Sequence, residues 1–362
     1  MKKAVFVIVF TCVLAMFATC ASAKMVIKLA NAGPENPDNR TVKAVEIFKY
    51  NVEKRTNGAL EVLPFHARKL GDEREMMEGV RLGTIQMIFV SSGPIPGFFP
   101  PVMVFDIPFM FSSAPAAWEL FESNFGKEFS EAFLKKTGVR CLSITENGYR
   151  HFTNNVRPIK TPADMKGLKI RTMQNPAHMA MVKALGADPT PIPFGELYMG
   201  LQQGVVDGME CPIVLIHDMK FYEVQDQMIL DGHLYNPLFT MANEKWFTSK
   251  LTPEQQKIVT EEAIILAHTH DGFSQQANIE CEGKLKAKGM TIYKPNAEQQ
   301  AMFRKLAQPA GLEFIRKKIG DEWVDKALAA AKKAETKVGN RAEAIVNEHI
   351  KMANDMYKEI KK

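Results

Sequence analysis

Two arginines that follow predicted β-strands are the residues of this sequence best suited to binding chemistry. Arg150 comes after a strand predicted over residues 139–145, and Arg171 ends a strand predicted over residues 168–171. A guanidinium group offers parallel N–H donors that match the oxygen atoms of a carboxylate or a sulfonate. An arginine at a strand end is most often a solvated surface residue, but two near the carboxyl edge of one sheet would form an anion clamp.

Motifs for catalysis are absent from the sequence. There is no G-x-S-x-G, H-E-x-x-H, P-loop, G-x-G-x-x-G or C-x-x-C pattern. His268 and His270 suggest a metal-binding pair, but residues two positions apart on a helix point in different directions and cannot chelate one ion. Absent motifs do not exclude an enzyme, but they leave no catalytic mechanism to propose. Our interpretation is a protein without enzyme activity, without a cofactor and without a metal site.

Predicted strands and helices alternate over residues 26–90. The strands are predicted at 26–30, 60–65 and 85–90, and the helices at 38–56 and 72–82. This order is typical of a mostly parallel sheet with helices on its faces.

A proline-rich segment follows the third of these strands. It contains Pro94, Pro96, Pro100, Pro101 and Pro108, so it can be neither a regular helix nor a central strand. We expect a rigid loop at the carboxyl end of that strand, where open α/β sheets usually bind their ligands.

The remaining sequence is also a mixture of strands and helices. Its patterns predict helices over 115–136, 176–185, 194–203, 253–283, 297–307 and 321–362, a helix start at 161–164, and a strand over 205–207.

The N-terminal segment has the three parts of a secretory signal. A basic start precedes an uncharged apolar run over residues 4–18, and the small residues at 21–23 fit a signal-peptidase site. We expect a signal peptide over residues 1–23, cleavage after Ala23 and a mature protein in the periplasm. An uncleaved anchor and a lipoprotein attached through Cys20 are the alternatives.

Composition describes a globular protein of near-neutral charge. The 362 residues are 24% charged and 46% hydrophobic, and the formal net charge is +5. Loss of two lysines with the signal leaves 44 basic and 41 acidic residues, or +3, which gives no electrostatic reason to bind nucleic acid. Cleavage also leaves Cys141, Cys211 and Cys281, an odd number, so at least one thiol is unpaired unless chains cross-link.

The chain resembles the solute-binding component of a tripartite ATP-independent periplasmic (TRAP) transporter, the DctP family. The resemblance spans nearly the whole mature chain and is most specific between residues 147 and 224. The matching motifs are Leu70-Gly71-Asp72, Asp106-Ile107-Pro108-Phe109, Gly148-Tyr149-Arg150, Asn155, Arg157-Pro158-Ile159, Ala163-Asp164-Met165-Lys166-Gly167-Leu168-Lys169-Ile170-Arg171, Pro193-Phe194, Glu196, Tyr198, Leu201-Gln202, Val206-Asp207-Gly208, Glu210, Pro212 and Lys220-Phe221-Tyr222-Glu223-Val224.

This resemblance implies an α/β, two-lobed periplasmic binding protein (type II-like, or Venus flytrap) with a long helix spanning both lobes. Lobe I would comprise residues 24–147 and 237–276, and lobe II residues 148–236 and 277–362. The ligand would lie between the lobes.

The same resemblance implies which residues bind the ligand. Arg171 falls on the family's signature arginine, which holds the acidic group of the ligand, and Arg150 falls on a second arginine that many members use. Phe194 matches an aromatic residue that packs on the ligand. The expected ligand-binding set is Arg171, Arg150, Phe194, Cys211, Asn31, Ser91, Ser92, His233 and Glu196.

Two departures from the family pattern bear on the ligand. Cys211 stands where the family usually has asparagine, so a strong directional hydrogen bond is lost. Ser91 and Pro94 replace the Glu and Arg of the sialic-acid branch, which argues against sialic acid. We expect a small organic anion: a C4-dicarboxylate, another carboxylate, or a small sulfonate such as isethionate.

The expected partners also follow from the resemblance. They are the small and large TRAP membrane subunits (DctQ- and DctM-like), with uptake driven by an ion gradient, and we expect the receptor to be a monomer. The alternatives are a ligand-presenting sensor partner, an ATP-driven (ABC-type) transport receptor and, remotely, a periplasmic enzyme.

Overall fold

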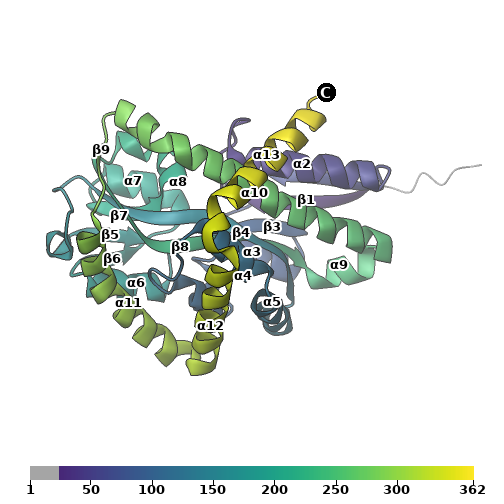
Figure 1. Ribbon diagram of the computed structural model, residues 1–362. Coiled ribbons are helices and arrows are strands. Elements are labelled where there is room, and N and C mark those ends of the chain that lie inside the picture. The colour runs from purple at the N-terminus through teal and green to yellow at the C-terminus, as the bar shows by residue number, and fades with distance from the viewer. Residues whose placement is uncertain (1–23) are drawn as a thin grey trace, which may run out of the picture.

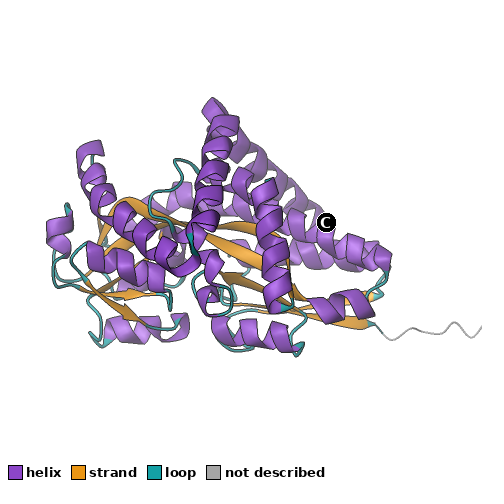
Figure 2. Ribbon diagram, turned by 90° about the horizontal axis from the view of Figure 1, so that it is seen from below, coloured by secondary structure: helices purple, strands orange, loops and turns teal. Residues whose placement is uncertain are grey.

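A single nine-stranded mixed sheet organises the molecule in the computed structural model, which describes residues 24–362. The predicted signal peptide and its cleavage site lie outside the described residues. The strands follow the order β2-β1-β3-β8-β4-β7-β5-β6, and β9 pairs with β8. Helices cover both faces of this sheet (Figures 1 and 2).

Each end of the sheet is a group of parallel strands. At one end, β1 (Met25–Asn31) lies between β2 (Leu60–Phe65) and β3 (Met87–Ser91). At the other end, β5 (Lys169–Thr172) lies between β6 (Asp188–Pro191) and β7 (Gly208–Pro212).

Two long antiparallel strands join these ends. They are β4 (Val139–Asn154) and β8 (Gln227–Asn243), which pair with each other along most of their length. The strand β8 also pairs with β3, and β4 pairs with β7, so each long strand continues from one end of the sheet into the other. The short β9 (Thr291–Tyr293) is parallel to β8.

The helices are distributed between the two ends. Those beside β1–β3 and the first half of β4 are α2 (Arg40–Arg55), α3 (Glu73–Leu82), α4 (Ala114–Glu122), α5 (Asn124–Thr137) and α9 (Glu244–Lys250). Those beside β5–β7 are α6 (Pro176–Ala184), α7 (Leu197–Gln202), α8 (Ile213–Asp218) and α11 (Ala297–Ile319). The short 3-10 turns are Ile95–Gly97, Pro100–Asp106, Pro162–Met165, Phe194–Glu196, Phe221–Glu223 and Gly339–Arg341.

The long helix α10 (Pro253–Ala287) has 35 residues and runs across both ends of the molecule (Figure 1). A capping box at Thr252 begins it: the Thr252 hydroxyl accepts from Gln255 N, and Gln255 Oε1 accepts from Thr252 N. None of the helices in residues 24–362 is both long and apolar enough to cross a membrane.

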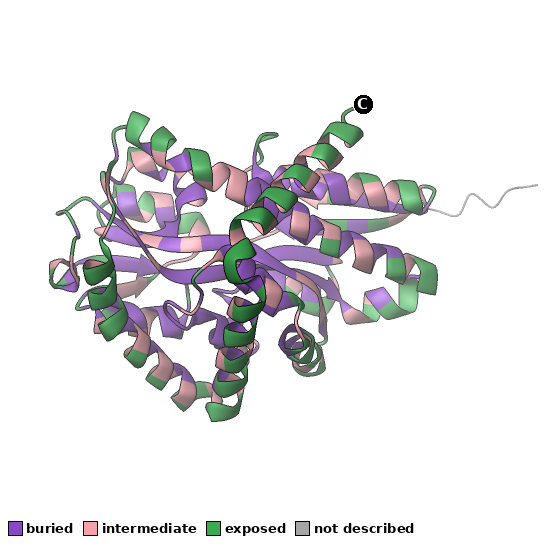
Figure 3. Cartoon of the chain, in the orientation of Figure 1, coloured by how far each residue is buried: buried purple, intermediate pink, exposed green. Residues whose placement is uncertain are grey.

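The strand β3 is buried on both faces, which makes it a rigid support. All five residues of β3 are buried, with Ile88 and Val90 in one apolar cluster and Met87 and Phe89 in another, on alternate faces. Figure 3 shows this pattern across the molecule, with buried strands inside and exposed residues on the outer sides of the helices.

The prediction of one helix over residues 115–136 is wrong. The chain forms α4 and α5 instead, because Ser123 interrupts the helix and accepts a hydrogen bond from Phe125 N as the cap of α5. Just after the break, a side chain at Gly126 would collide with the carbonyl oxygen of Phe121, so only glycine fits there.

Several other predicted boundaries also differ. The strand predicted at 205–207 is β7 at 208–212, and the proline-rich segment contains two 3-10 turns. The predicted helix at 297–307 extends to Ile319, and the C-terminal helix divides into α12 (Asp321–Val338) and α13 (Ala342–Ile360).

The division of the chain into two lobes at the predicted residues stays a prediction. In the structure α12 packs on α4, and α13 packs on α2 and α10. Ala331 and Ala334 of α12 share an apolar cluster with Trp118, and Ala353 of α13 shares one with Phe48. The C-terminal helices thus contact elements of the predicted lobe I.

Close packing between α10 and α13 can be tested at two glycines of one helix. A side chain at Gly272 would collide with the His349 carbonyl oxygen, whereas Gly283 has nothing within 4 Å of the corresponding position. We expect Gly272→Ala to destabilise the protein by about 1–3 kcal/mol, and Gly283→Ala to stabilise it by about 0.5–1 kcal/mol. Urea unfolding measures both; equal effects would contradict the close approach.

Candidate functional site

A partly open cavity lies between the two parallel ends of the sheet, and about 50 Å³ of it is accessible to the centre of a water molecule. Its walls come from β1, α2, α3 and β3 on one side and from β5, β7 and the Phe194 turn on the other, with β4 and β8 between them. The lining residues are Asn31, Ala32, Gly33, Arg40, Thr41, Glu73, Phe89, Ser91, Asn147, Arg150, Arg171, Met173, Phe194, Cys211, Leu215 and Leu238.

Six of the nine predicted ligand-binding residues line this cavity. They are Arg171, Arg150, Phe194, Cys211, Asn31 and Ser91. They come from five different strands and one turn, so the fold brings together residues that are up to 180 positions apart in sequence.

The other three predicted residues lie elsewhere. Ser92 is fully buried, and its hydroxyl accepts a hydrogen bond from Asn236 Nδ2 at 2.7 Å. His233 is also fully buried, with its Nδ1 2.9 Å from Asp231 Oδ2. Glu196 is exposed and lines a neighbouring cavity that opens beside the first.

Arg171 is a buried cation without an acidic partner. Its side chain is 1% exposed, and its Nε donates to the Ile192 carbonyl oxygen at 2.9 Å. Among residues 24–362 no carboxylate oxygen lies within 4.0 Å of its guanidinium nitrogens. Burial lowers the pKa of Arg171 to about 10, with Glu210 opposing and Arg150 reinforcing the effect, so the group is still a cation at neutral pH.

Arg150, by contrast, is already paired. Its Nε and Nη2 both donate to the carboxylate of Glu210, and Nη2 also donates to the Glu210 carbonyl oxygen at 2.6 Å. Both side chains are 2% exposed or less. This fork arrangement holds the Arg150 guanidinium at the cavity wall.

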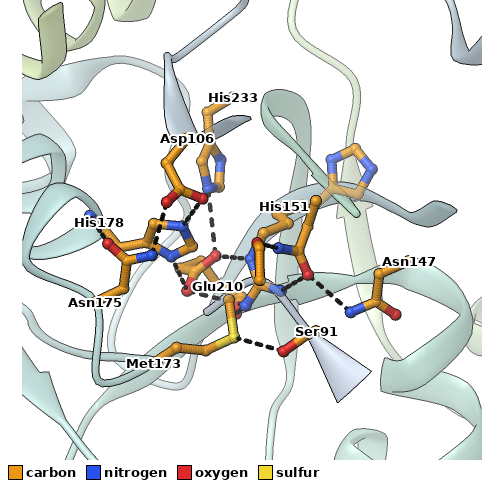
Figure 4. Close-up of polar contacts among 12 residues, drawn as sticks. Ser91, Asp106, Asn147, His151, Met173, Asn175, His178, Glu210 and His233 are labelled. Atoms are coloured by element: carbon orange, nitrogen blue, oxygen red, sulfur yellow. Dashed lines mark hydrogen bonds and ion pairs between the residues drawn. The ribbon is translucent and has the colours of Figure 1, made fainter. Parts of the chain in front are cut away.

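Glu210 is the centre of a buried network behind the cavity (Figure 4). Its Oε1 lies 3.5 Å from His178 Nδ1, and its Oε2 lies 3.8 Å from His233 Nε2. Burial would raise the pKa of Glu210, but Arg150 and the two histidines outweigh it and hold that pKa well below 4.5. The network therefore keeps Glu210 ionised and Arg150 in place.

His178 links this network to the 3-10 turn Pro100–Asp106. Its Nε2 lies 2.9 Å from Asp106 Oδ1, and Asn175 Nδ2 donates to Asp106 Oδ2 at 2.8 Å. Burial would lower the pKa of His178, but Asp106 and Glu210 outweigh it and raise the pKa to about 9.

Two charged residues of the cavity were not among the predicted set. Arg40 is 4% exposed; its Nη1 donates to Asn147 O and Ser274 Oγ, both at 3.0 Å, and its Nη2 donates to Asn147 Oδ1 at 2.9 Å. Glu73 accepts hydrogen bonds from Ser91 N at 2.7 Å and Ser91 Oγ at 3.0 Å. An arginine or glutamate in the first turn of a helix carries no sequence signal for such a role.

Cys211 contributes a neutral thiol to the cavity wall. Burial raises its pKa to about 11, and the thiol is free. Cys141 and Cys281 are free as well.

Residues 24–362 contain no group of three His, Cys, Asp or Glu side chains that could hold a metal ion. His268 and His270 bond to separate partners: His268 Nε2 contacts Glu122, and His270 Nε2 lies 3.2 Å from Thr41 Oγ1.

Two hydrogen bonds span the molecule beside the cavity, next to its lining residues Phe194 and Arg40. Gly195 N donates to Asp72 Oδ2 at 3.0 Å, and Asn39 Nδ2 donates to Asp218 Oδ2 at 2.8 Å. Each of these bonds joins an element near β1–β3 to an element near β5–β7. The two ends of the sheet therefore meet around the cavity.

The model of bacterial extracellular solute-binding proteins, family 7 (DctP), matches residues 32–318. The chain belongs to this family. A 2,3-diketo-L-gulonate-binding periplasmic protein, YiaO of Escherichia coli K12, is 36% identical over 250 residues, which cover 69% of this chain and 75% of that protein. The predicted family, that of TRAP solute-binding proteins, is thus confirmed.

Solved structures of the family share the fold. The sugar acid binding protein DctPAm of Advenella mimigardefordensis, in complex with galactonate, has a TM-score of 0.82 and 32% identity, covering 86% of this chain and 99% of its own. A TRAP periplasmic solute-binding protein of Polaromonas sp. JS666, bound to D-erythronate, has a TM-score of 0.79 and 33% identity, covering 84% and 99%. The predicted two-lobed α/β class with a long helix is confirmed.

The Arg150–Glu210 pair can be tested by a double-variant cycle. Arg150→Met leaves an ionised, buried Glu210 without its main partner, and we expect a loss of about 3–5 kcal/mol in the free energy of unfolding. Adding Glu210→Gln removes the stranded charge, so the double variant should be more stable than Arg150→Met alone. Urea unfolding at pH 7 measures this; additive losses would contradict the pairing.

The raised pKa of His178 predicts a dependence of stability on pH. A folded-state pKa of about 9 against 6.5 means that its contribution, roughly 3 kcal/mol, is complete below pH 6.5 and is lost as pH rises through 9. Urea unfolding between pH 6 and 10 should show this loss in the unmodified protein and a flatter profile in His178→Gln. Parallel profiles would show that His178 is not charged in the fold.

Proposed function

We propose that this protein is a periplasmic solute receptor of a TRAP transporter that binds a small organic acid as its anion. The observation that carries the proposal is Arg171, a buried guanidinium group at the wall of the cavity with no carboxylate within 4.0 Å among the described residues. An acid group of the ligand would supply the missing counter-charge.

The physics of burial supports this assignment. Removing an ion from water costs several kcal/mol, which an opposite charge with good hydrogen-bond geometry offsets. Arg150 has its counter-charge in Glu210, whereas the terminal nitrogens of Arg171 are free of protein carboxylates. A carboxylate bound bidentately to Arg171 would neutralise this cation and offset the free-energy cost of burying it without a partner.

The volume and lining of the cavity favour a small ligand. Only about 50 Å³ of the cavity is accessible to the centre of a water molecule, so a bulky ligand would require the cavity to widen. Phe194 and Leu238 offer apolar surface, while Asn31, Ser91 and Asn147 offer hydrogen-bonding groups. The relatives that bind 2,3-diketo-L-gulonate, galactonate and D-erythronate support a carboxylic acid as the ligand class; a C4-dicarboxylate and a small sulfonate such as isethionate are the other predicted classes.

The transport cycle follows from closure around the anion. A ligand that contacts both ends of the sheet favours the closed form by its differential affinity for that form. The closed receptor would then deliver the anion to the small and large membrane subunits for uptake driven by an ion gradient. The bonds of Asp72 and Asn39 across the cavity mark the surfaces that meet on closure.

Thermal denaturation with a panel of small carboxylates and sulfonates tests the proposal. A ligand at 100 times its dissociation constant should stabilise the protein by about 2.7 kcal/mol. Arg171→Gln should abolish this stabilisation, because it removes the cation that meets the acid group. The matched control is Lys169→Gln on the same strand, which removes an exposed positive charge and should leave binding unchanged.

Two outcomes would contradict the proposal. One is a panel in which no organic acid raises the melting temperature of the unmodified protein. The other is an Arg171→Gln variant that binds a ligand of the unmodified protein with the same affinity.

A further inference from the structure

A carboxylate faces the anion-binding arginine across the cavity. Glu73, in the first turn of α3, lines the same cavity as Arg171, and both residues also line the neighbouring opening. The two side chains form no ion pair within 4.0 Å. A ligand whose acid group meets Arg171 therefore extends into a space that Glu73 borders.

Glu73 is held in this position by Ser91, the last residue of β3. Ser91 N and Ser91 Oγ donate to its two carboxylate oxygens, one to each. A carboxylate has about four lone-pair sites, so each oxygen keeps capacity to accept one further hydrogen bond. Burial raises the pKa of Glu73 above 4.5, and the bonds from Ser91 oppose that rise.

We propose that Glu73 determines specificity by restricting the site to ligands with one negative charge and a hydroxyl group, that is, to hydroxylated monocarboxylates. The inference rests on the proposed function, because it assumes that an acid group of the ligand occupies Arg171. The ligand hydroxyl would donate to Glu73, and a second carboxylate at this place would be repelled.

The unpaired charges of the cavity agree with a single ligand charge. Glu210 neutralises Arg150, whereas Arg171 has no carboxylate and Glu73 has no cation within 4.0 Å among the described residues. A monoanion at Arg171 supplies the missing counter-charge. A dianion would leave an excess negative charge beside Glu73 in a poorly solvated space, where like charges strongly disfavour each other.

Arg40 would favour a dicarboxylate ligand, because a second arginine could bind a second acid group. Its Nη1 and Nη2 already make three hydrogen bonds to Asn147 and Ser274. Both bonds to Asn147 fix the guanidinium against β4. Protein groups therefore take up much of the hydrogen-bonding capacity of Arg40, although its positive charge still lines the cavity. Glu73 keeps free acceptor capacity, and we therefore place the ligand's second polar contact there.

Matched ligands of equal length test this inference by isothermal titration calorimetry. D-Erythronate and succinate each have four carbons, but the first is a trihydroxy monocarboxylate and the second a dicarboxylate. Galactonate and adipate form the corresponding six-carbon pair. We expect the unmodified protein to bind the hydroxylated monocarboxylate of at least one pair at least tenfold more tightly than the dicarboxylate.

Glu73→Gln should reduce this preference at least tenfold, because it removes the repulsion and weakens the acceptor. Glutamine keeps an oxygen for Ser91 N and the same shape, so the variant should retain its melting temperature without ligand. Glu78→Gln, on the exposed side of the same helix, is the matched control and should keep the preference of the unmodified protein.

The outcomes separate this inference from the proposed function. Tighter binding of a dicarboxylate, or a preference that Glu73→Gln leaves unchanged, overturns the role of Glu73 while Arg171-dependent binding stands. Binding of none of the four acids also overturns the inference. Only failure of the whole panel of organic acids, described above, overturns the proposed function itself.

Discussion

An unpaired, buried arginine is the constraint on which the rest of the site depends. Arg171 is 1% exposed, and its one side-chain hydrogen bond within residues 24–362 is to the Ile192 carbonyl oxygen. A protein interior tolerates such a cation only where a partner completes its electrostatic environment. The neighbouring Arg150 shows the alternative, because Glu210 satisfies it on two nitrogens. By this contrast, Arg171 is the arginine that would bind a ligand, and Arg150 is the arginine that forms part of the cavity wall.

The fold supplies the rigidity that this arrangement needs. Arg171 stands on β5 and Arg150 on β4, and both strands are joined through β7 in one continuous sheet. Glu210 lies on β7, opposite Phe152 in the register, so backbone pairing itself sets its place between the arginine and the histidines. The cavity then forms where the two parallel ends of the sheet meet, with hydrogen bonds from Gly195 to Asp72 and from Asn39 to Asp218 at its rims.

Elements with strong local signals could be predicted from the sequence. The helix α3 is an example, because Asp72 and Glu75 form a capping box and Gly83 ends it in the left-handed conformation. The break between α4 and α5 was not predicted, because Phe121, Phe125 and Phe129 keep helical spacing across Ser123, the residue that caps α5. The strand β8 gave no pattern either: it is buried along almost its whole length and carries polar residues such as Asp231 and His233 that pair inside the fold.

The site residues also fall into those that the sequence motifs predict and those that only the fold reveals. Arg150, Arg171 and Cys211 were found through the family motifs, and they line the cavity. Arg40 and Glu73 were missed, because each looks like an ordinary residue at the start of a helix. The burial of Arg40 comes from Asn147 and Ser274, which are 107 and 234 residues away in sequence. Such roles arise from tertiary contacts, and local spacing does not encode them.

A crystal structure with a bound organic acid from the panel tests most directly whether Arg171 binds the ligand. We expect two oxygens of the ligand's acid group to lie about 2.7–2.9 Å from the terminal nitrogens of Arg171. An acid group bound elsewhere in the cavity, with Arg171 still lacking a counter-charge, would contradict it.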